Sequence, residues 1–500
     1  MNPKMKDTVT LNRHNIDNDT LSLLVNISRY LKNNKIKSYT VGGFIRDTLL
    51  GRSISDIDIA ISGDVFNIGG SLASHLKGKF IKLDQQHKIC RIVFSENPAL
   101  YLDLSSYTGT IAGDLKRRDF TINAMAIDLD NLIEESDQFQ IIDPFQGILD
   151  LDHGIIRAVG EDSLSADPIR LLRAMRFAAE LGFTIEHKTE RLIKQSADLI
   201  STIAGERLRE ELLSLMEVSR GGHYLKYMEE FGLLTGIVPE LQLTKGVTQP
   251  SEHYWDVFEH SLMTVTAVDY LLGQGIWEYS DDRILTEVPW SPELARYFDE
   301  QVVSGSTRRT LLKLAALLHD ISKPQAKTVE NNGKMRFLGH SDMGAAVAAS
   351  ILERLRFSSK EINLVSNVVK YHLRPNQMGQ PPSRHAVYRY FRDVGEAGLD
   401  VLYVSLADHL ATRGPSLIMT NWREHAETIR HILDEFNRQK VITKPMRFID
   451  GNDLINIYGL KPGPEMGLLL EKLKEGQATG ELVNRQSALD YVKNFLREGK

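Results

Sequence analysis

Residues 37–62, KSYTVGGFIRDTLLGRSISDIDIAIS, decide the fold of the first part of the chain. KSYTVGG is typical of a short strand that runs into a glycine pair, and FIRDTLLG is typical of a helix closed by Gly51. SDIDIAIS alternates Asp and Ile with the period of two that indicates a strand. Because side chains two positions apart on a strand point to one face, we expect Asp56 and Asp58 to lie side by side.

The surrounding sequence extends this strand–helix–strand unit into an α+β domain. Apolar positions at helical spacing predict a helix over residues 19–34. KICRIVF (88–94) and ALYLDLSS (99–106) predict strands, and DFTINAMAIDLD (119–130) begins a further helix-then-strand unit. From about residue 161 helical patterns dominate, with weak breaks at Gln249–Pro250, 380–382 and 414–415. The sequence therefore predicts a mixed first domain followed by all-α domains.

Composition excludes several classes of protein. The chain has 500 residues, 42% of them apolar and 25% charged, which excludes a disordered, collagenous or coiled-coil protein. Its net charge of −6 means that a polyanion partner must meet a local basic patch. The single cysteine, Cys90, excludes an intrachain disulfide and a cysteine-based zinc site. With no apolar run of about 18 residues and no apolar segment near the start, we expect a cytoplasmic protein without membrane or disulfide-linked partners.

The aspartate pair has a chemical interpretation. Two adjacent carboxylates raise each other's pKa unless a cation lies between them. Oxygen ligands of this kind suit Mg²⁺, which keeps waters and a substrate phosphate in its shell. For an isolated Asp-x-Asp pattern, however, a solvated strand face is the simpler explanation. The pair thus needs support from its surroundings.

That support comes from neighbouring residues. Gly42 and Gly43 follow a strand and open a helix, where bare backbone N–H groups can approach a phosphate. Arg46 lies one turn into that helix and could reach a triphosphate with two N–H groups. Asp103, on a later strand, could supply a third carboxylate. This combination suits nucleotidyl transfer, in which two metal ions hold the attacking hydroxyl and the leaving oxygen.

Five ordered motifs resemble those of the tRNA nucleotidyltransferase and bacterial poly(A) polymerase superfamily. They are VGGFIRDTLLGRSISDIDIA (41–60), DLKRRDFTINAMAID (114–128), IIDPFQGILDLDHGIIRAVG (141–160), ADPIRLLRAMRFAAELGF (166–183) and GERLREELL (205–213). The resemblance implies a polymerase-β-like nucleotidyltransferase domain in which Asp56 and Asp58 hold Mg²⁺. It also implies nucleotide-binding roles for Gly42, Gly43, Arg46, Arg118, Asp119 and Asn123.

A charged row in the fourth motif bears on base choice. Asp167, Arg170, Arg173 and Arg176 recur every three residues on one expected helix, and a salt-bridged surface helix is the simpler alternative. The apolar residues between them favour a mostly buried helix, whose arginines need partners. Cytosine and adenine both show an amino group beside a ring-nitrogen acceptor, which a carboxylate and an arginine match. The family is understood to select CTP and ATP in this way, here through Asp167 and Arg170; relatives often carry a glutamate where this chain has Ala166.

The second half carries a histidine and aspartate set. His260, His319–Asp320, His340, His372 and Asp408 follow in that order, and histidine and aspartate ligands at helix ends suit a catalytic metal. The order resembles the HD metal-dependent phosphohydrolase domain, in the version attached to bacterial tRNA nucleotidyltransferases (FLGHSDMGAAVAASILERLRF, 337–357). Because the set is complete, we expect an active phosphohydrolase with a divalent metal whose identity the sequence does not give. GNDLINIYGLKPGPEMGLLLEKLKEGQATGEL (451–482) resembles the tail of the same group.

The domains follow from these matches. We expect a nucleotidyltransferase domain (20–160), a helical nucleotide- and RNA-binding domain (161–245), an HD domain (246–415) and a helical, tRNA-binding tail (416–500). The function implied is template-independent addition of C and A to the tRNA 3′ end, from CTP and ATP, with release of pyrophosphate.

Three alternatives stay open: a CC-only enzyme, a poly(A) polymerase, and an HD phosphohydrolase whose first half merely binds nucleotide. The CC-only alternative has a specific motive. In relatives that change from C to A, a longer segment rich in Gly and Arg lies between the third carboxylate and the second motif. Here Ser105–Gly113 is a nine-residue connection without one arginine.

Overall fold

The computed structural model describes residues 10–54, 56–85, 88–94, 100–133, 137–279, 283–442 and 448–498. Ser55 and Ala99, at the starts of two expected strands, lie outside these ranges. The chain forms two compact units, residues 1–203 and 204–500. Their boundary falls within the helical domain expected over 161–245, so the four domain limits remain a prediction.

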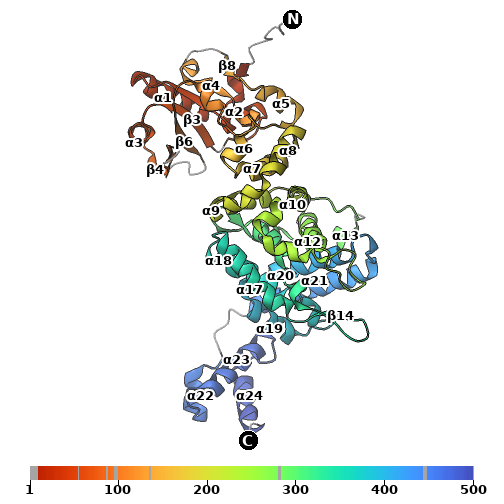
Figure 1. Ribbon diagram of the computed structural model, residues 1–500. Helices are drawn as coiled ribbons and strands as arrows, with labels where there is room; N and C mark the ends of the chain where they lie inside the picture. Colours follow the sequence, from red (N-terminus) through yellow and green to blue (C-terminus); the bar gives the residue numbers. More distant parts are fainter. Residues whose placement is uncertain are drawn as a thin grey trace. The chain divides into compact units, whose positions relative to one another are not determined.

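The first unit is built on an eight-stranded sheet with the order β1-β8-β7-β2-β3-β6-β5-β4 (Figure 1). Its strands are β1 (Thr10–Asn12), β2 (Ser38–Val41), β3 (Asp56–Ser62), β4 (Lys79–Asp84), β5 (Ile89–Val93), β6 (Tyr101–Tyr107), β7 (Ala126–Asp128) and β8 (Gln138–Ile142). Within the described residues β3 and β6 are parallel, and the other pairs are antiparallel. The mixed α+β architecture expected for this region is confirmed.

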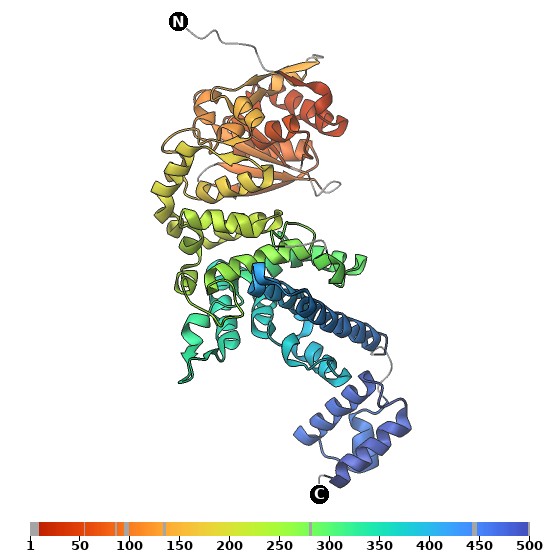
Figure 2. The same ribbon diagram turned by 90° about the vertical axis from the view of Figure 1, so that its right-hand side faces the viewer.

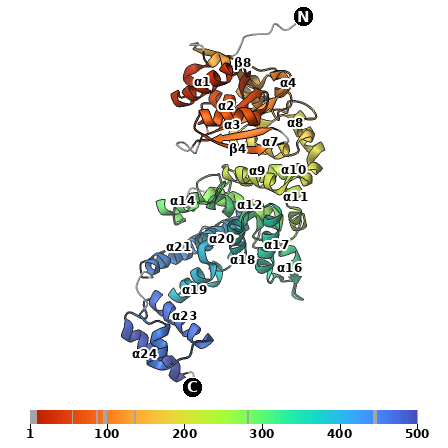
Figure 3. The ribbon, with the colours of Figure 1, turned by 90° about the vertical axis from the view of Figure 1, so that its left-hand side faces the viewer.

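Three helices cover one face of this sheet (Figure 3). They are α1 (Asn18–Asn33), α2 (Gly43–Leu49) and α3 (Val65–His75). Ile57, Ile59 and Ile61 of β3 are buried in the core that these helices share. Because strand residues alternate, the aspartates between these isoleucines lie on the opposite face. The helices thus cover the apolar face of the sheet, and the aspartates lie on its other, polar face.

The remaining helices of this unit are α4 (Ile111–Leu115), α5 (Gly147–His153), α6 (Ser163–Ala166), α7 (Arg170–Leu181) and α8 (His187–Ser196), and β9 (Ile155–Ile156) pairs with β10 (Thr184–Ile185). One expectation was wrong here: Asp167 does not lie on the helix that carries the three arginines. Its backbone is extended (φ −144°, ψ 96°), and α7 begins only at Arg170. The cause is Pro168, since proline disfavours the helical conformation in the residue before it. The helix expected at the start of 119–130 is a single 3₁₀ turn, η2 (Thr121–Asn123).

The second unit is helical. Its helices are α9 (Gly205–Glu217), α10 (Gly221–Glu230), α11 (Leu233–Ile237), α12 (Val257–Leu271), α13 (Arg283–Glu287), α14 (Pro292–Asp299), α15 (Arg308–Leu318), α16 (Lys323–Ala326), α17 (His340–Arg354), α18 (Ser359–Tyr371), α19 (Arg384–Val394), α20 (Gly398–Arg413) and α21 (Met419–Ile442), followed by α22 (Gly451–Tyr458), α23 (Pro464–Ala478) and α24 (Arg485–Glu498). Two short hairpins interrupt them, β11–β12 (Gln301–Val303, Ser306–Thr307) and β13–β14 (Lys327–Val329, Met335–Phe337). Every residue of α15 is buried, among α12, α18 and α20, so this helix is the centre of the unit.

The last three helices form a small bundle (Figure 2). Leu454, Leu469 and Val492 are fully or almost fully buried within it. The helix before this bundle, α21, packs on α20. Trp422 of α21 donates a hydrogen bond to the Ile284 carbonyl at 3.2 Å. No helix among the described residues combines the length and apolar character needed to cross a bilayer.

Candidate active sites

Three aspartates lie on the polar face of the sheet. In the parallel pair β3–β6, Asp58 lies opposite Asp103, and Asp56 lies opposite Tyr101. Burial raises the pKa of Asp58 to about 6; Arg118 lowers it, and Asp56 and Asp103 raise it. The expected grouping of the three aspartates is therefore present. It favours a proton or a cation because like charges are held together.

Gly42 brings the glycine turn against Asp58. It follows β2 with a φ of +70°, a conformation that a residue with a side chain rarely adopts. A Cβ atom here would lie 2.6 Å from Arg118 Nη1 and 3.2 Å from Asp58 Oδ2. Arg118 also forms an ion pair with Asp114 at 3.5 Å. The structure thus places Gly42, Arg118 and Asp58 together, with Gly43 as the first residue of α2.

A chain of hydrogen bonds runs behind this turn. Arg46 Nη1 donates to Asn123 Oδ1 at 2.7 Å, and Asn123 Nδ2 donates to Asp119 Oδ1 at 3.1 Å. Arg173 Nε donates to Asp119 Oδ2 at 2.9 Å. Burial alone would raise the pKa of Asp119, but Arg173 and the donated hydrogen bonds lower it to about 2. Arg46 is only 8% exposed and also bonds Asp47, so it anchors the turn instead of standing free before the glycine pair.

The other residues expected to contact the nucleotide base have different hydrogen-bond partners. Arg170 donates from its two Nη atoms to the backbone carbonyls of Arg117, Arg118 and Ser163, at 2.7–3.2 Å. Arg176 bonds Glu180 one turn later on α7, in an ion pair that is partly buried. The four charged residues therefore do not form one row. Arg170 instead fixes the loop that carries Arg118.

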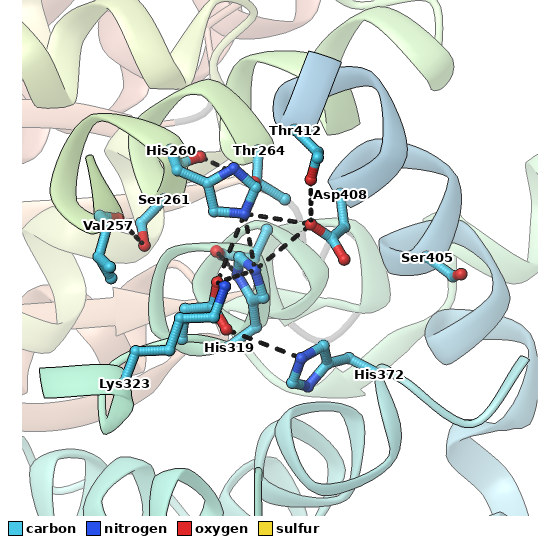
Figure 4. A network of polar contacts seen from close by, with 12 residues as sticks. Val257, His260, Ser261, Thr264, His319, Lys323, His372, Ser405, Asp408 and Thr412 are labelled. Atoms are coloured by element: carbon cyan, nitrogen blue, oxygen red, sulfur yellow. Dashed lines mark hydrogen bonds and ion pairs between the residues drawn. The ribbon is translucent and has the colours of Figure 1, made fainter. Parts of the chain in front are cut away.

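All six expected residues of the second site converge inside the helical unit. Figure 4 shows four of them, His260, His319, His372 and Asp408. Asp320 lies 3.1 Å from His319 Nε2, 3.3 Å from His340 Nε2 and 3.8 Å from His372 Nε2. His260 Nε2 lies 3.1 Å from Asp408 Oδ1 and 3.2 Å from His319 Nε2. One expectation needs correction: Asp408 lies within α20, not at a helix end.

The orientation of three imidazoles fits a metal site. His319, His340 and His372 each place Nδ1 2.6–2.8 Å from the carbonyl three residues earlier. If Nδ1 donates its proton there, the lone pair of Nε2 points into the cluster. Burial lowers the pKa of His260 and lowers that of His372 to about 4, which favours the neutral form that binds metal. Histidine nitrogens with carboxylate oxygens suit a transition metal better than Mg²⁺.

Comparisons with known proteins identify the family and its domains. Residues 38–157 match the poly A polymerase head domain, 182–244 the "probable RNA and SrmB-binding site of polymerase A", and 289–413 the HD domain. The chain is 30% identical to an A-adding tRNA nucleotidyltransferase of Deinococcus radiodurans, over 92% of this chain and 95% of that one. It is also 30% identical to a CC-adding tRNA nucleotidyltransferase of Thermus thermophilus, over 91% and 93%. The chain belongs to the tRNA nucleotidyltransferase family.

Solved structures agree with the fold of this tRNA nucleotidyltransferase. A Thermotoga maritima CCA-adding enzyme complexed with tRNA superposes with a TM-score of 0.61 at 24% identity, covering 96% of this chain and 97% of that one. A CCA-adding enzyme in an apo form gives 0.64 at 22% identity, covering 96% and 95%. The polymerase head and HD domains are of kinds that use divalent metals, and the buried groups His260–His319–Asp320 and Asp320–His340–His372 have the spacing for one.

The HD site of the tRNA nucleotidyltransferase opens into a cavity of about 450 Å³. The Nζ of Lys323 lies 2.6 Å from Asp320 Oδ2 and donates to Gln249 Oε1 at 2.6 Å. Lys334, Arg336 and Arg413 also line the cavity, so its lining is rich in cations. Sequence reasoning missed Lys323. Its position three residues after Asp320, across the turn between α15 and α16, was the available signal.

Sequence reasoning also missed Arg91 on β5. This arginine donates from Nε to Asp103 Oδ1 at 2.7 Å and from Nη2 to Asp103 Oδ2 at 2.8 Å. The signal was one charged residue in the apolar strand KICRIVF.

Proposed function

We propose that this enzyme adds nucleotides, without a template, to the 3′ end of tRNA from CTP, or from CTP and ATP, and releases pyrophosphate. One observation carries the proposal: Asp56, Asp58 and Asp103 share one sheet face, with Asp58 against the glycine turn and Arg118. The relatives support it, since they are named for this chemistry on tRNA. This role also implies a cytoplasmic location.

The chain's residues divide the work of this reaction. Asp56 and Asp58 would hold Mg²⁺, which activates the attacking hydroxyl and neutralises charge on the leaving pyrophosphate. The N–H groups at the start of α2 and the Arg118 guanidinium bind the triphosphate. The chain of bonds from Arg46 through Asn123 and Asp119 to Arg173 keeps this turn rigid. Such preorganised charge contributes most where charge develops in the transition state.

Base choice is assigned to Asp167 and Arg170. The carboxylate accepts from the exocyclic amino group of cytosine or adenine, and the guanidinium donates to the ring nitrogen. Three carbonyl contacts already hold Arg170, and its Nε–H takes no part in them. Its position is therefore set before a base arrives.

We further propose that addition stops after two C residues. β6 continues to Tyr107 and α4 begins at Ile111, where the Thr110 side chain caps the helix by accepting from the Gly113 N–H. Only Thr108–Thr110 remain as a connection, too few residues for an element with two arrangements around the base pocket. Relatives named as CC-adding, 27–30% identical over 91–94% of the chain, are consistent with this scope, but an A-adding relative is equally similar, at 30% over 92%, so the short connection carries the proposal.

Three substrates test this scope: tRNA lacking CCA, the same tRNA ending in C, and the same tRNA ending in CC. Each is incubated with CTP and ATP at physiological concentrations, and the 3′ ends are sequenced. We expect the first two to end in CC and the third to stay unchanged. A terminal A on the first substrate would establish full CCA addition, and extension of the third substrate alone would establish A addition. No incorporation on any of the three would overturn the nucleotidyl transfer itself.

A second function is favoured at the HD site, namely metal-dependent hydrolysis of phosphate esters. The six converging ligand side chains and the cation-lined cavity of about 450 Å³ support it. The direct test loads the purified protein with Mn²⁺, Co²⁺, Ni²⁺ or Zn²⁺ and measures phosphate release from nucleoside monophosphates and from 2′,3′-cyclic phosphates. Release that requires metal and is lost with a chelator supports the assignment. Release by none of the metal-loaded forms contradicts it.

A further inference from the structure

A row of charged residues crosses three neighbouring strands of the sheet. Asp58 on β3 lies opposite Asp103 on β6, and Asp103 lies opposite Arg91 on β5. On the other side of β3 lies β2, which is followed by Gly42 and its turn. Across the sheet, the order is thus the turn, the two metal-binding aspartates, the third carboxylate and Arg91.

Arg91 is held firmly and carries a permanent charge. Two parallel hydrogen bonds fix it to both oxygens of Asp103, and its guanidinium carbon lies 3.8 Å from the centre of the Tyr101 ring. The hydrogen bonds to Asp103 raise the pKa of Arg91, so it stays protonated at every working pH. An arginine anchored by two bonds and a ring face loses little freedom on making further contacts.

Part of this guanidinium remains available. Of its five N–H groups, Asp103 takes two, and the others have no partner among the residues that the structure describes. The side chain is 30% exposed, on the same face as the carboxylates. A charged group with unused donors beside a nucleotidyl-transfer site suits a phosphate. Neutralising Asp103 alone would not need the remaining donors.

The geometry of the reaction indicates which phosphate. This step rests on the proposed function. In an in-line displacement the attacking hydroxyl and the leaving pyrophosphate lie on opposite sides of the α-phosphorus. With the triphosphate at Gly42 and Arg118, the 3′-hydroxyl must approach from the side of β6 and β5. We propose that Arg91 binds the backbone phosphate of the last nucleotide of the tRNA while its bidentate bond positions Asp103.

The test compares Arg91→Gln and Arg91→Lys with Lys82→Gln. Lys82 is a cation on the adjacent strand β4, but its Nζ lies 5.2 Å from the Phe66 ring on the helix-covered face. Binding of tRNA lacking CCA is measured by fluorescence anisotropy over a range of salt concentrations, without nucleotide, so the result does not depend on catalysis. KM for tRNA and KM for CTP are measured separately.

We expect Arg91→Gln to weaken tRNA binding roughly fivefold to tenfold and to lower the slope of log Kd against log salt by about 1, the loss of one phosphate contact. KM for tRNA should rise while KM for CTP changes less than about twofold, because only uniform binding of the RNA is lost. Arg91→Lys should restore the salt slope but not the full kcat, since an ammonium cannot form the paired bond with Asp103. Lys82→Gln should behave like the unchanged protein.

An Asp103→Asn variant separates a failure of the proposed function from a failure of the phosphate contact at Arg91. If Asp103→Asn incorporates CTP normally, the carboxylate assignment in the proposed function fails, while the binding data on Arg91→Gln still decide the phosphate contact. If Arg91→Gln and Arg91→Lys bind tRNA with unchanged affinity and salt slope, the phosphate contact is refuted. A rise in KM for CTP in place of tRNA would equally overturn it, because Arg91 would then lie on the nucleotide side.

Discussion

The two candidate sites are built on different principles. In the sheet, neighbouring strands and loops bring arginines to the carboxylates: Arg118 lies beside Asp58, and Arg91 bonds Asp103. In the helical unit, four histidines crowd around two aspartates with Lys323 as a nearby cation, and three of the rings are oriented by the carbonyl three residues earlier.

This difference separates two ways of holding ligands. In the sheet site, fixed arginines offset part of the carboxylate charge, whereas the HD site is a set of aimed donors with the spacing for a metal. Because the sites lie in separate compact units, we expect a substitution that inactivates one site to leave the activity of the other unchanged.

The largest effect should come from Asp58→Asn, which removes charge from the sheet site without changing its volume. Nucleotide incorporation should fall about 10²–10³-fold, the scale of losing one major electrostatic contribution in a preorganised site. CTP incorporation is measured beside Asp19→Asn, an exposed aspartate of α1, as control. HD hydrolysis measured on the same preparation should be unchanged. Near-normal incorporation would refute the metal-binding role of Asp58.

His319→Ala is the reverse experiment, because it removes a ligand from the HD site and leaves the sheet site unchanged. Loss of one ligand should lower metal affinity by at least about 10–100-fold, with phosphate-ester hydrolysis lost in proportion, since outer contacts alone have effects of that size. CTP incorporation should stay nearly intact. Metal content is measured by mass spectrometry, with His187→Ala as control because that side chain is 94% exposed. If a folded His319→Ala protein loses both activities, the independence of the two sites is wrong.

Local patterns in the sequence predicted part of each site. The alternation in SDIDIAIS fixed which face of β3 carries the aspartates, and the order of histidines and aspartates identified the HD set. Pro168 was also visible, and the rule that it keeps the preceding residue out of a helix would have placed Asp167 correctly.

What sequence reasoning missed depends on long-range geometry. β4 has no buried residue, and β8 has only two, which alternate with exposed ones. Both strands lie toward the edges of the sheet, so the alternation of apolar and polar residues that predicts a strand is weak in them. The pairing of Arg91 with Asp103 requires the strand register, which lies outside any local window. Likewise, nothing local indicates that Arg170 bonds the carbonyls of Arg117 and Arg118.

A smaller effect sharpens the role of the turn. Gly42→Ala would place a methyl group 2.6 Å from Arg118 Nη1 in a backbone conformation of positive φ. We expect kcat/KM for CTP to fall about tenfold, since displacing Arg118 adds to a strain of roughly 1–2 kcal/mol. Gly109→Ala is the matched control: its φ is +78°, but no atom lies within 4 Å of the added methyl group. Equal losses in both variants would show that strain alone, and not the contact with Arg118, is responsible.

The smallest effect concerns base choice. Arg170→Ala removes the donor assigned to the ring nitrogen and also releases the carbonyls of Arg117 and Arg118. Losing one hydrogen bond of about 1 kcal/mol to the base should reduce the preference for CTP over UTP by about fivefold. Releasing the two carbonyls should lower the rate of incorporation of both nucleotides. Competition between labelled CTP and UTP on one tRNA separates the two effects, because the ratio of products is independent of the common rate. A ratio that stays constant while the rate falls would mean that Arg170 supports the loop of Arg118 and takes no part in selecting the base.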